Sequence, residues 1–135
     1  MTEDARKIIL ERTLPHPPEK IWRALTQPHL LEEWLMKTDF RPDVGKGFSF
    51  SAEWGAVHGK VLEAEPHRSL SYTWGDDHLK SVVTWTLTET ETGTHLRLEQ
   101  VGFPKDQPRY FMGAKAGWPR FLDNLEQVLG REESK

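Results

Sequence analysis

The clearest hydrophobic pattern in the sequence lies near its C-terminal end, between residues 106 and 130. Apolar residues recur there at spacings of three and four, which places them on one face of a helix that packs against the rest of the protein. Asp106 can cap the start of this helix, and Gly130 suits the left-handed residue that follows a last helical turn. The apolar face consists of Phe111, Ala114, Trp118, Phe121, Leu122, Leu125, Val128 and Leu129.

Pro119 interrupts this helical pattern. A proline has no amide hydrogen to bond to the carbonyl of Lys115, so we expect a kink at this position. Gly113 and Gly117 precede the proline, and each glycine lowers helix stability by about 1 kcal/mol relative to alanine. Two explanations for these glycines stay open. They let the helix backbone pack closely on its partner, or they leave volume for a ligand.

The rest of the chain alternates between strand-like and helix-like patterns. Residues 7–14 are rich in β-branched residues and predict a strand. Two short helices follow, one beginning at Pro18 and one after Pro28, each with a short apolar face. Residues 36–46 show no steady periodicity and predict a loop. Further strands are predicted at residues 47–51, 57–64, 69–74, 81–90 and 94–101.

This order of elements predicts an α+β protein with about six strands. Closely spaced strands joined by short turns form an antiparallel meander. We expect a helix-grip fold, in which a strongly curved antiparallel sheet wraps around the long C-terminal helix and the two short helices follow the first strand. No repeat or linker divides the 135 residues, so we expect residues 1–135 to form a single domain.

Composition excludes several classes of function. The net charge is only −3 and the 18 lysine and arginine residues are scattered, which argues against nucleic-acid binding. Cysteine is absent, so disulfides and thiolate chemistry are excluded, and a reducing cytoplasm is the expected location. The charged N-terminus does not have the pattern of a signal peptide, so none is expected, and no apolar run is long enough to cross a membrane. We therefore expect a cytoplasmic monomer.

The sequence offers little for catalysis or metal binding. Its six histidines do not form the tight clusters typical of zinc sites. It contains no Gly-x-Ser-x-Gly motif and no glycine-rich phosphate loop. No catalytic residue, metal or cofactor is predicted. General acid–base chemistry by His58, Tyr72, Arg97 or Glu99 is an alternative, but alternate strand positions in a one-sided sheet face solvent.

Six tryptophans are the unusual feature of the composition. Large aromatic rings fill protein cores, but they also line apolar ligand cavities. We expect such a cavity between the long helix and the sheet, with His58, Tyr72 or Glu99 orienting a hydroxyl or carbonyl group of the ligand. The candidate ligand-binding residues are Trp34, Phe50, Trp54, His58, Tyr72, Trp74, Trp85, Glu99, Phe111, Ala114, Gly117 and Trp118.

Several short motifs resemble a known superfamily. PPEKIWRALT at residues 17–26, followed by LEEW at 31–34, resembles the opening of START-like proteins, which include the birch pollen allergen and polyketide cyclases. Within this superfamily the chain most resembles the proteins named after the C-terminal domain of the activator of the heat-shock-protein-90 ATPase. Similar motifs are GKVLE at 59–63, LSYTW at 70–74, Gly93-Thr94, Gly102-Phe103, and Gly117-Trp118 with Leu122 and Leu125.

The resemblance implies a helix-grip fold with a cavity for a small, largely apolar molecule. Such a molecule is lipid-like or resembles an aromatic polyketide. The leading hypothesis is therefore the binding of a small hydrophobic ligand. One alternative is an enzyme that acts in the cavity as a cyclase, dehydratase or hydrolase. Another is a co-chaperone-like domain that binds a chaperone or other protein in a stress response, which requires an exposed apolar patch.

Overall fold

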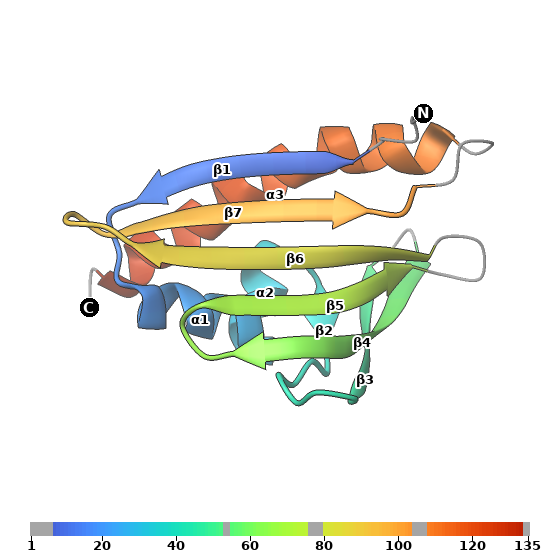
Figure 1. The fold of residues 1–135 in the computed structure, drawn as a ribbon, viewed down its shortest axis with the longest axis horizontal. Helices are drawn as coiled ribbons and strands as arrows, with labels where there is room; N and C mark the ends of the chain where they lie inside the picture. Colours follow the sequence, from blue (N-terminus) through green and yellow to red (C-terminus); the bar gives the residue numbers. More distant parts are fainter. Residues whose placement is uncertain (1–6, 53–54, 76–79, 104–107, 134–135) are drawn as a thin grey trace.

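The computed structural model describes residues 7–52, 55–75, 80–103 and 108–133. These ranges form a curved antiparallel sheet of seven strands with three helices (Figure 1). The predicted α+β helix-grip fold is confirmed, with seven strands in place of about six. In chain order the elements are β1 (Ile8–Leu14), α1 (Pro18–Thr26), α2 (Pro28–Trp34), β2 (Lys37–Thr38), β3 (Gly47–Ala52), β4 (Gly55–Glu65), β5 (Ser69–Gly75), β6 (Lys80–Glu89), β7 (Thr94–Val101) and α3 (Pro108–Glu133).

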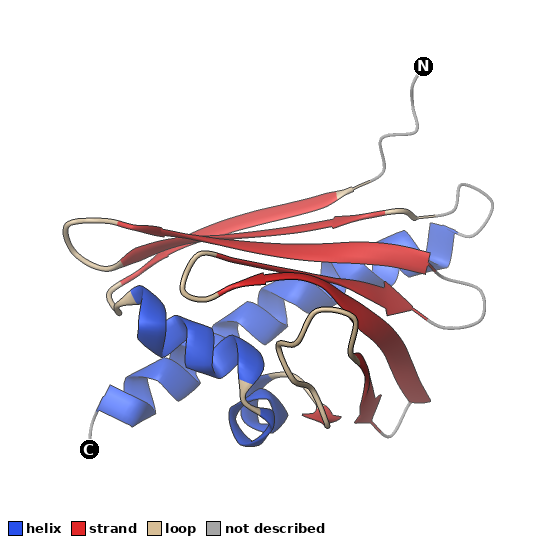
Figure 2. Ribbon diagram, turned by 60° about the horizontal axis from the view of Figure 1, so that its bottom comes forward, coloured by secondary structure: helices blue, strands red, loops and turns tan. Residues whose placement is uncertain are grey.

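The strands follow the order β1-β7-β6-β5-β4-β3-β2, so every strand from β2 to β7 pairs with its neighbour in sequence. β1 closes the other edge by pairing with β7, from Ile8 opposite Gln100 to Leu14 opposite Thr94. The three helices lie on one face of the sheet, which bends around them (Figure 2). This curvature gives the sheet a concave inner face, and α3 runs diagonally across it.

The buried face of α3 is the face that the hydrophobic spacing predicts. Trp118, Leu122, Leu125, Val128 and Leu129 are all buried in the core. The apolar positions nearer the start of the helix, together with Phe121, are only partly buried and pack at the margin of that core. The two halves of the helix are therefore packed to different extents.

Two local predictions are wrong, and a third concerns a residue outside the described ranges. Gly130 does not follow the last turn, because α3 continues through it to Glu133; the buried side chains of Val128 and Leu129 hold this turn in place. The predicted loop at residues 36–46 contains the short strand β2, whose Lys37 and Thr38 pair with β3. The Thr38 hydroxyl also donates a hydrogen bond of 2.7 Å to the Ser49 carbonyl. Asp106 lies outside the described residues.

Gly59 in β4 marks a close approach between two strands. A β-carbon built at this position would overlap the carbonyl oxygen of Thr73 in β5 and lie 2.7 Å from Cζ of Phe48. Glycine is required here because the neighbouring backbone occupies the space of a side chain. Gly102 has a different role. Its φ of 100° is one that glycine adopts readily, and it turns the chain from β7 toward Phe103.

Substituting Gly59 with alanine is expected to lower the free energy of unfolding by about 1–3 kcal/mol, because the added methyl group overpacks the β4–β5 pair. Gly47→Ala is the matched control, since its β-carbon would meet the nearest atom at an ordinary 3.6 Å. Urea denaturation of both variants measures the difference. Equal midpoints for the two variants would contradict the assigned close approach.

Candidate functional site

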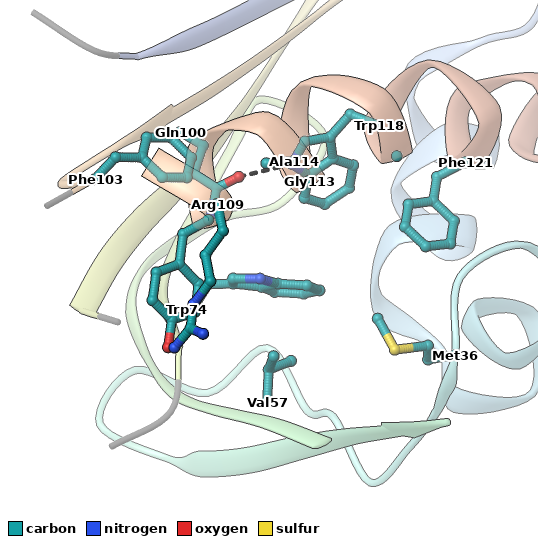
Figure 3. A pocket seen from close by; sticks show the side chains of 12 residues that line it. Met36, Val57, Trp74, Gln100, Phe103, Arg109, Gly113, Ala114, Trp118 and Phe121 are labelled. Atoms are coloured by element: carbon teal, nitrogen blue, oxygen red, sulfur yellow. Dashed lines mark hydrogen bonds between the residues drawn. The ribbon is translucent and has the colours of Figure 1, made fainter. Parts of the chain in front are cut away.

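A pocket of about 230 Å³ lies between the first half of α3 and the concave face of the sheet (Figure 3). Its walls are mostly apolar and aromatic, which is typical of small-molecule sites. The sheet and its adjoining loops contribute Met36, Val57, Trp74, Gln100 and Phe103.

The helical wall of the pocket owes its shape to missing side chains. Gly113, Ala114, Gly117, Trp118 and Phe121 line it, at spacings that place them on one side of a helix. A β-carbon built on Gly113 meets no atom within 4 Å, and one built on Gly117 meets only Phe121, at 3.8 Å. The glycines therefore do not bring the helix backbone close to the sheet. They leave the space open.

A chain of buried hydrogen bonds fixes α3 over the sheet at this pocket. The Trp118 indole N–H donates to Oε1 of Gln100 at 2.7 Å, and Nε2 of Gln100 donates to the Ser81 hydroxyl at 2.9 Å. That hydroxyl donates to the backbone carbonyl of Trp74 at 2.5 Å. Buried polar groups are costly unless they are paired. The chain therefore sets the position of Trp118 relative to β5, β6 and β7.

The structure brings four of the predicted ligand-binding residues into this pocket. Trp74, Ala114, Gly117 and Trp118 line it. The indole rings of Trp74 and Trp118 are 5.5 Å apart between centroids and inclined at 48°. Phe111 is half-buried beside the pocket, where its ring meets the edge of the pocket-lining Phe103 at a centroid distance of 5.5 Å.

Four other predicted residues lie in the packed core and do not line this pocket. The indole N–H of Trp34 donates to the Ala24 carbonyl at 2.7 Å, and that of Trp85 donates to the Tyr72 hydroxyl at 2.9 Å. Phe50 packs against Trp74 at a centroid distance of 5.2 Å. Burial raises the pKa of Tyr72 well above its usual value. Its phenol therefore stays neutral and is no general base near neutral pH.

His58 and Glu99 lie on the opposite face of the sheet from the pocket. His58 is exposed and follows the pocket-lining Val57 in β4, and successive strand residues point to opposite faces. Glu99 follows the buried Leu98 in β7, and its carboxylate lies 3.7 Å from the Arg97 guanidinium. Trp54 lies outside the described residues.

Sequence reasoning missed several residues of the pocket. Gln100 continues the inward face of β7 after Leu96 and Leu98, so strand alternation could have identified it. The others depend on how separate segments meet in three dimensions, which no local pattern reveals. They are Met36, Val57, Phe103, Arg109 and Tyr110. Phe121 also lines the pocket, and the helical spacing places it on the apolar face.

The described ranges show neither a metal centre nor a membrane-spanning helix. No group of three or more histidine, aspartate or glutamate side chains within them could hold a metal ion. None of the helices in the same ranges is long and apolar enough to cross a membrane.

Comparisons with known proteins agree with this fold. The solved structure of protein MLL2253 from Mesorhizobium loti is 57% identical, with a TM-score of 0.90 over 93% of this chain and 97% of that one. CalU16 from Micromonospora echinospora is 26% identical, with a TM-score of 0.77 over 95% and 78%. DynU16, a putative protein in the dynemicin biosynthetic locus, shares the fold at 23% identity, with a TM-score of 0.83 over 93% and 47%.

The curated proteins include no match to this chain. The model for the family described as Activator of Hsp90 ATPase homolog 1-like protein matches residues 15–130. This match spans the first helix pair, the sheet from β2 onward and nearly all of α3, and it confirms the resemblance carried by the sequence motifs. The chain belongs to the family of activator of Hsp90 ATPase homolog 1-like proteins.

Proposed function

We propose that the protein binds a small, largely hydrophobic molecule in the pocket between α3 and the sheet. The observation that carries this proposal is the pair Gly113 and Gly117, which leaves open space on the inner side of α3. Aromatic rings border that space, including Trp74 and Trp118. Removing apolar ligand surface from water supplies most of the affinity in a site of this kind.

The volume of the pocket narrows the ligand class. About 230 Å³ is less than the roughly 300–1,000 Å³ typical of sites for drug-sized molecules. A compact molecule of one or two rings suits this space better than a lipid with a long acyl chain. Within the broader expectation of a lipid-like or aromatic ligand, the aromatic class is therefore favoured.

No specific observation favours the enzymatic alternative. The described pocket lining contains no carboxylate and no imidazole, and these are the groups that most often transfer protons at neutral pH. Tyr72 is neutral and its hydroxyl is hydrogen-bonded to Trp85.

The co-chaperone-like alternative is supported by the family match but by no surface feature of the described residues. It requires a contiguous apolar patch, and the described chain exposes few large apolar side chains. They are Ile9 in β1, Val44 in the loop before β3, Leu62 in β4 and Met112 in α3.

We propose a single domain over residues 1–135 that works as a monomer in the cytoplasm, and the absence of cysteine supports that location.

A ligand titration followed by NMR tests the proposed function. Naphthalene derivatives, polyphenols and fatty acids are added in turn to ¹⁵N-labelled protein. We expect ring compounds to shift the amide signals of Gly113 and Gly117 and the indole signals of Trp74 and Trp118. The amide of Thr94, at the far end of β7, serves as the internal control and should not move. A panel that leaves all four pocket residues unshifted would contradict the proposal.

A further inference from the structure

We infer that the ligand of this pocket carries a carbonyl oxygen on its apolar ring, and that the indole N–H of Trp74 binds this oxygen. This inference rests on the proposed function and names the chemical class of the ligand together with the residue that selects it. It follows from a hydrogen-bond donor in the pocket wall for which the described residues supply no acceptor.

Trp74 is only 8% exposed and lines the pocket, yet its indole N–H has no acceptor among the described residues. Trp34, Trp85 and Trp118 each donate their indole N–H to an acceptor within the protein. The indole of Trp22 also lacks an acceptor in the described ranges, but Trp22 does not line this pocket. Trp74 is therefore the tryptophan of the described pocket wall whose polar group is left for a ligand.

The indole nitrogen of Trp74 is not sealed inside the protein. Among the described residues, Thr90 Oγ1 is the only side-chain polar atom that is both sealed and unpartnered. The Trp74 nitrogen has no partner in these ranges either, so it must keep contact with open space. Because the indole lies within the pocket (Figure 3), a molecule bound there can reach its N–H.

The direction of this N–H is set before a ligand arrives. The Trp74 ring packs against Phe50 at a centroid distance of 5.2 Å and against Trp118 at 5.5 Å. A donor that is held in place in this way loses little conformational entropy when it binds its partner. Gly113 and Gly117 line the same pocket and leave the space that the apolar part of the ligand would fill.

The other polar side chains of the described lining set no such requirement on the ligand. Gln100 and Trp118 are hydrogen-bonded to each other. The hydroxyl of Tyr110 can donate or accept, so it suits either kind of ligand group. Arg109 is exposed, and its guanidinium lies over the Tyr110 ring. The indole of Trp74 is the group that needs one particular kind of partner.

This partner must be an acceptor, because an indole N–H can donate but cannot accept. A carbonyl oxygen meets the requirement and brings no donor of its own. A hydroxyl would bring a proton that needs an acceptor in turn, and the amide oxygen of Gln100 already accepts from Trp118. A carboxylate would give up the hydration of a charge for one neutral donor, which is costly in an apolar pocket. An aromatic ketone or aldehyde is therefore the favoured class of ligand.

The test compares two ligands of nearly the same shape. 2-Acetylnaphthalene carries a carbonyl group, whereas 2-isopropenylnaphthalene has C=CH₂ in place of C=O. Isothermal titration calorimetry measures both affinities in the wild-type protein and in Trp74→Phe. We expect Trp74→Phe to lower the ratio of ketone affinity to alkene affinity by about fivefold, the size of effect typical of one hydrogen bond. The smaller ring of the variant and the different hydration of the two ligands cancel in this comparison.

Trp85→Phe is the matched control for Trp74→Phe. It makes the same substitution on the neighbouring strand, but Trp85 does not line this pocket and its N–H already donates to Tyr72. The affinity ratio in this variant should equal that of the wild-type protein.

A second measurement uses the wild-type protein alone, so it does not depend on how well a variant folds. The indole ¹H signal of Trp74 is assigned by NMR from its nuclear Overhauser contacts with the ring of Phe50. It should move downfield when 2-acetylnaphthalene binds, because a hydrogen bond deshields the donated proton. The alkene should move it less.

The outcomes separate the two proposals. An affinity ratio that Trp74→Phe leaves unchanged, or that Trp85→Phe lowers as much, would overturn the assignment of a carbonyl ligand and leave the proposed function intact. An indole signal of Trp74 that responds equally to the ketone and the alkene would do the same. So would failure of the ketone to bind while another ring compound of the panel shifts the pocket signals. If no member of the panel binds, both proposals are overturned.

Discussion

Substituting Gly117 with leucine is expected to lower the affinity of the pocket for a ring compound by at least about 100-fold. Side chains on a helix point toward its N-terminus and cover the preceding turn. A leucine at position 117 would therefore extend over Gly113, into the space that the ligand needs. A 100-fold loss corresponds to about 2.7 kcal/mol of binding free energy. Calorimetric titration with 2-acetylnaphthalene measures it.

The loss of binding should occur without loss of stability. Leucine favours a helix over glycine by roughly 0.5–1 kcal/mol, and the β-carbon at position 117 meets Phe121 at an ordinary 3.8 Å. Gly130→Ala is the control, because it raises the helix propensity of the same helix at a position outside the pocket. A β-carbon added there meets no atom within 4 Å. Undiminished affinity in Gly117→Leu would show that the ligand binds elsewhere.

Substituting Trp118 with alanine is expected to lower the free energy of unfolding by about 3–5 kcal/mol, the range for deleting a large buried aromatic side chain. The indole is 3% exposed, and its ring lies 5.5 Å from Trp74 and 5.7 Å from Trp85 between centroids. Its removal would also leave the amide oxygen of Gln100 without its hydrogen bond. Urea denaturation followed by circular dichroism measures the change.

Trp118→Phe separates packing from hydrogen bonding at the same position. It keeps an aromatic ring but has no N–H for Gln100, so we expect a smaller loss of about 1–3 kcal/mol. This variant also supplies a measurement if the alanine variant does not fold, since domains are stable by only about 5–15 kcal/mol. A wild-type unfolding midpoint for Trp118→Phe would show that the hydrogen bond to Gln100 contributes no net stability.

Much of the fold can be predicted from the sequence because helices and strands leave local patterns of hydrophobic residues. The spacing of Leu122, Leu125 and Leu129 identifies the buried face of α3, and strand alternation separates Leu98 from Glu99. The two-residue strand β2 has no such signal, because it exists only through pairing with β3. Gly130 is misleading for a related reason, since burial of Leu129 outweighs the low helix propensity of glycine.

The candidate site is less predictable, because core and pocket aromatics look alike in the sequence. Trp85 and Trp74 both occupy inward positions on neighbouring strands, yet only Trp74 lines the pocket. The difference lies on α3, where residues 113 and 117 have no side chains to fill the space opposite. Arg109 has no distinguishing local pattern, and its place in the pocket lining depends on where the first turn of α3 meets the sheet.

The unequal packing of α3 has a consequence for the stability of its parts. Every fully buried residue of the described helix lies at or after Trp118, and Pro119 leaves the backbone ladder without its bond to the Lys115 carbonyl. The first half of α3 can therefore detach at a lower free energy than global unfolding requires. A molecule held beneath it raises that local free energy in proportion to the logarithm of its concentration relative to Kd. Occupancy of the pocket and order in the first half of α3 are in this way thermodynamically linked.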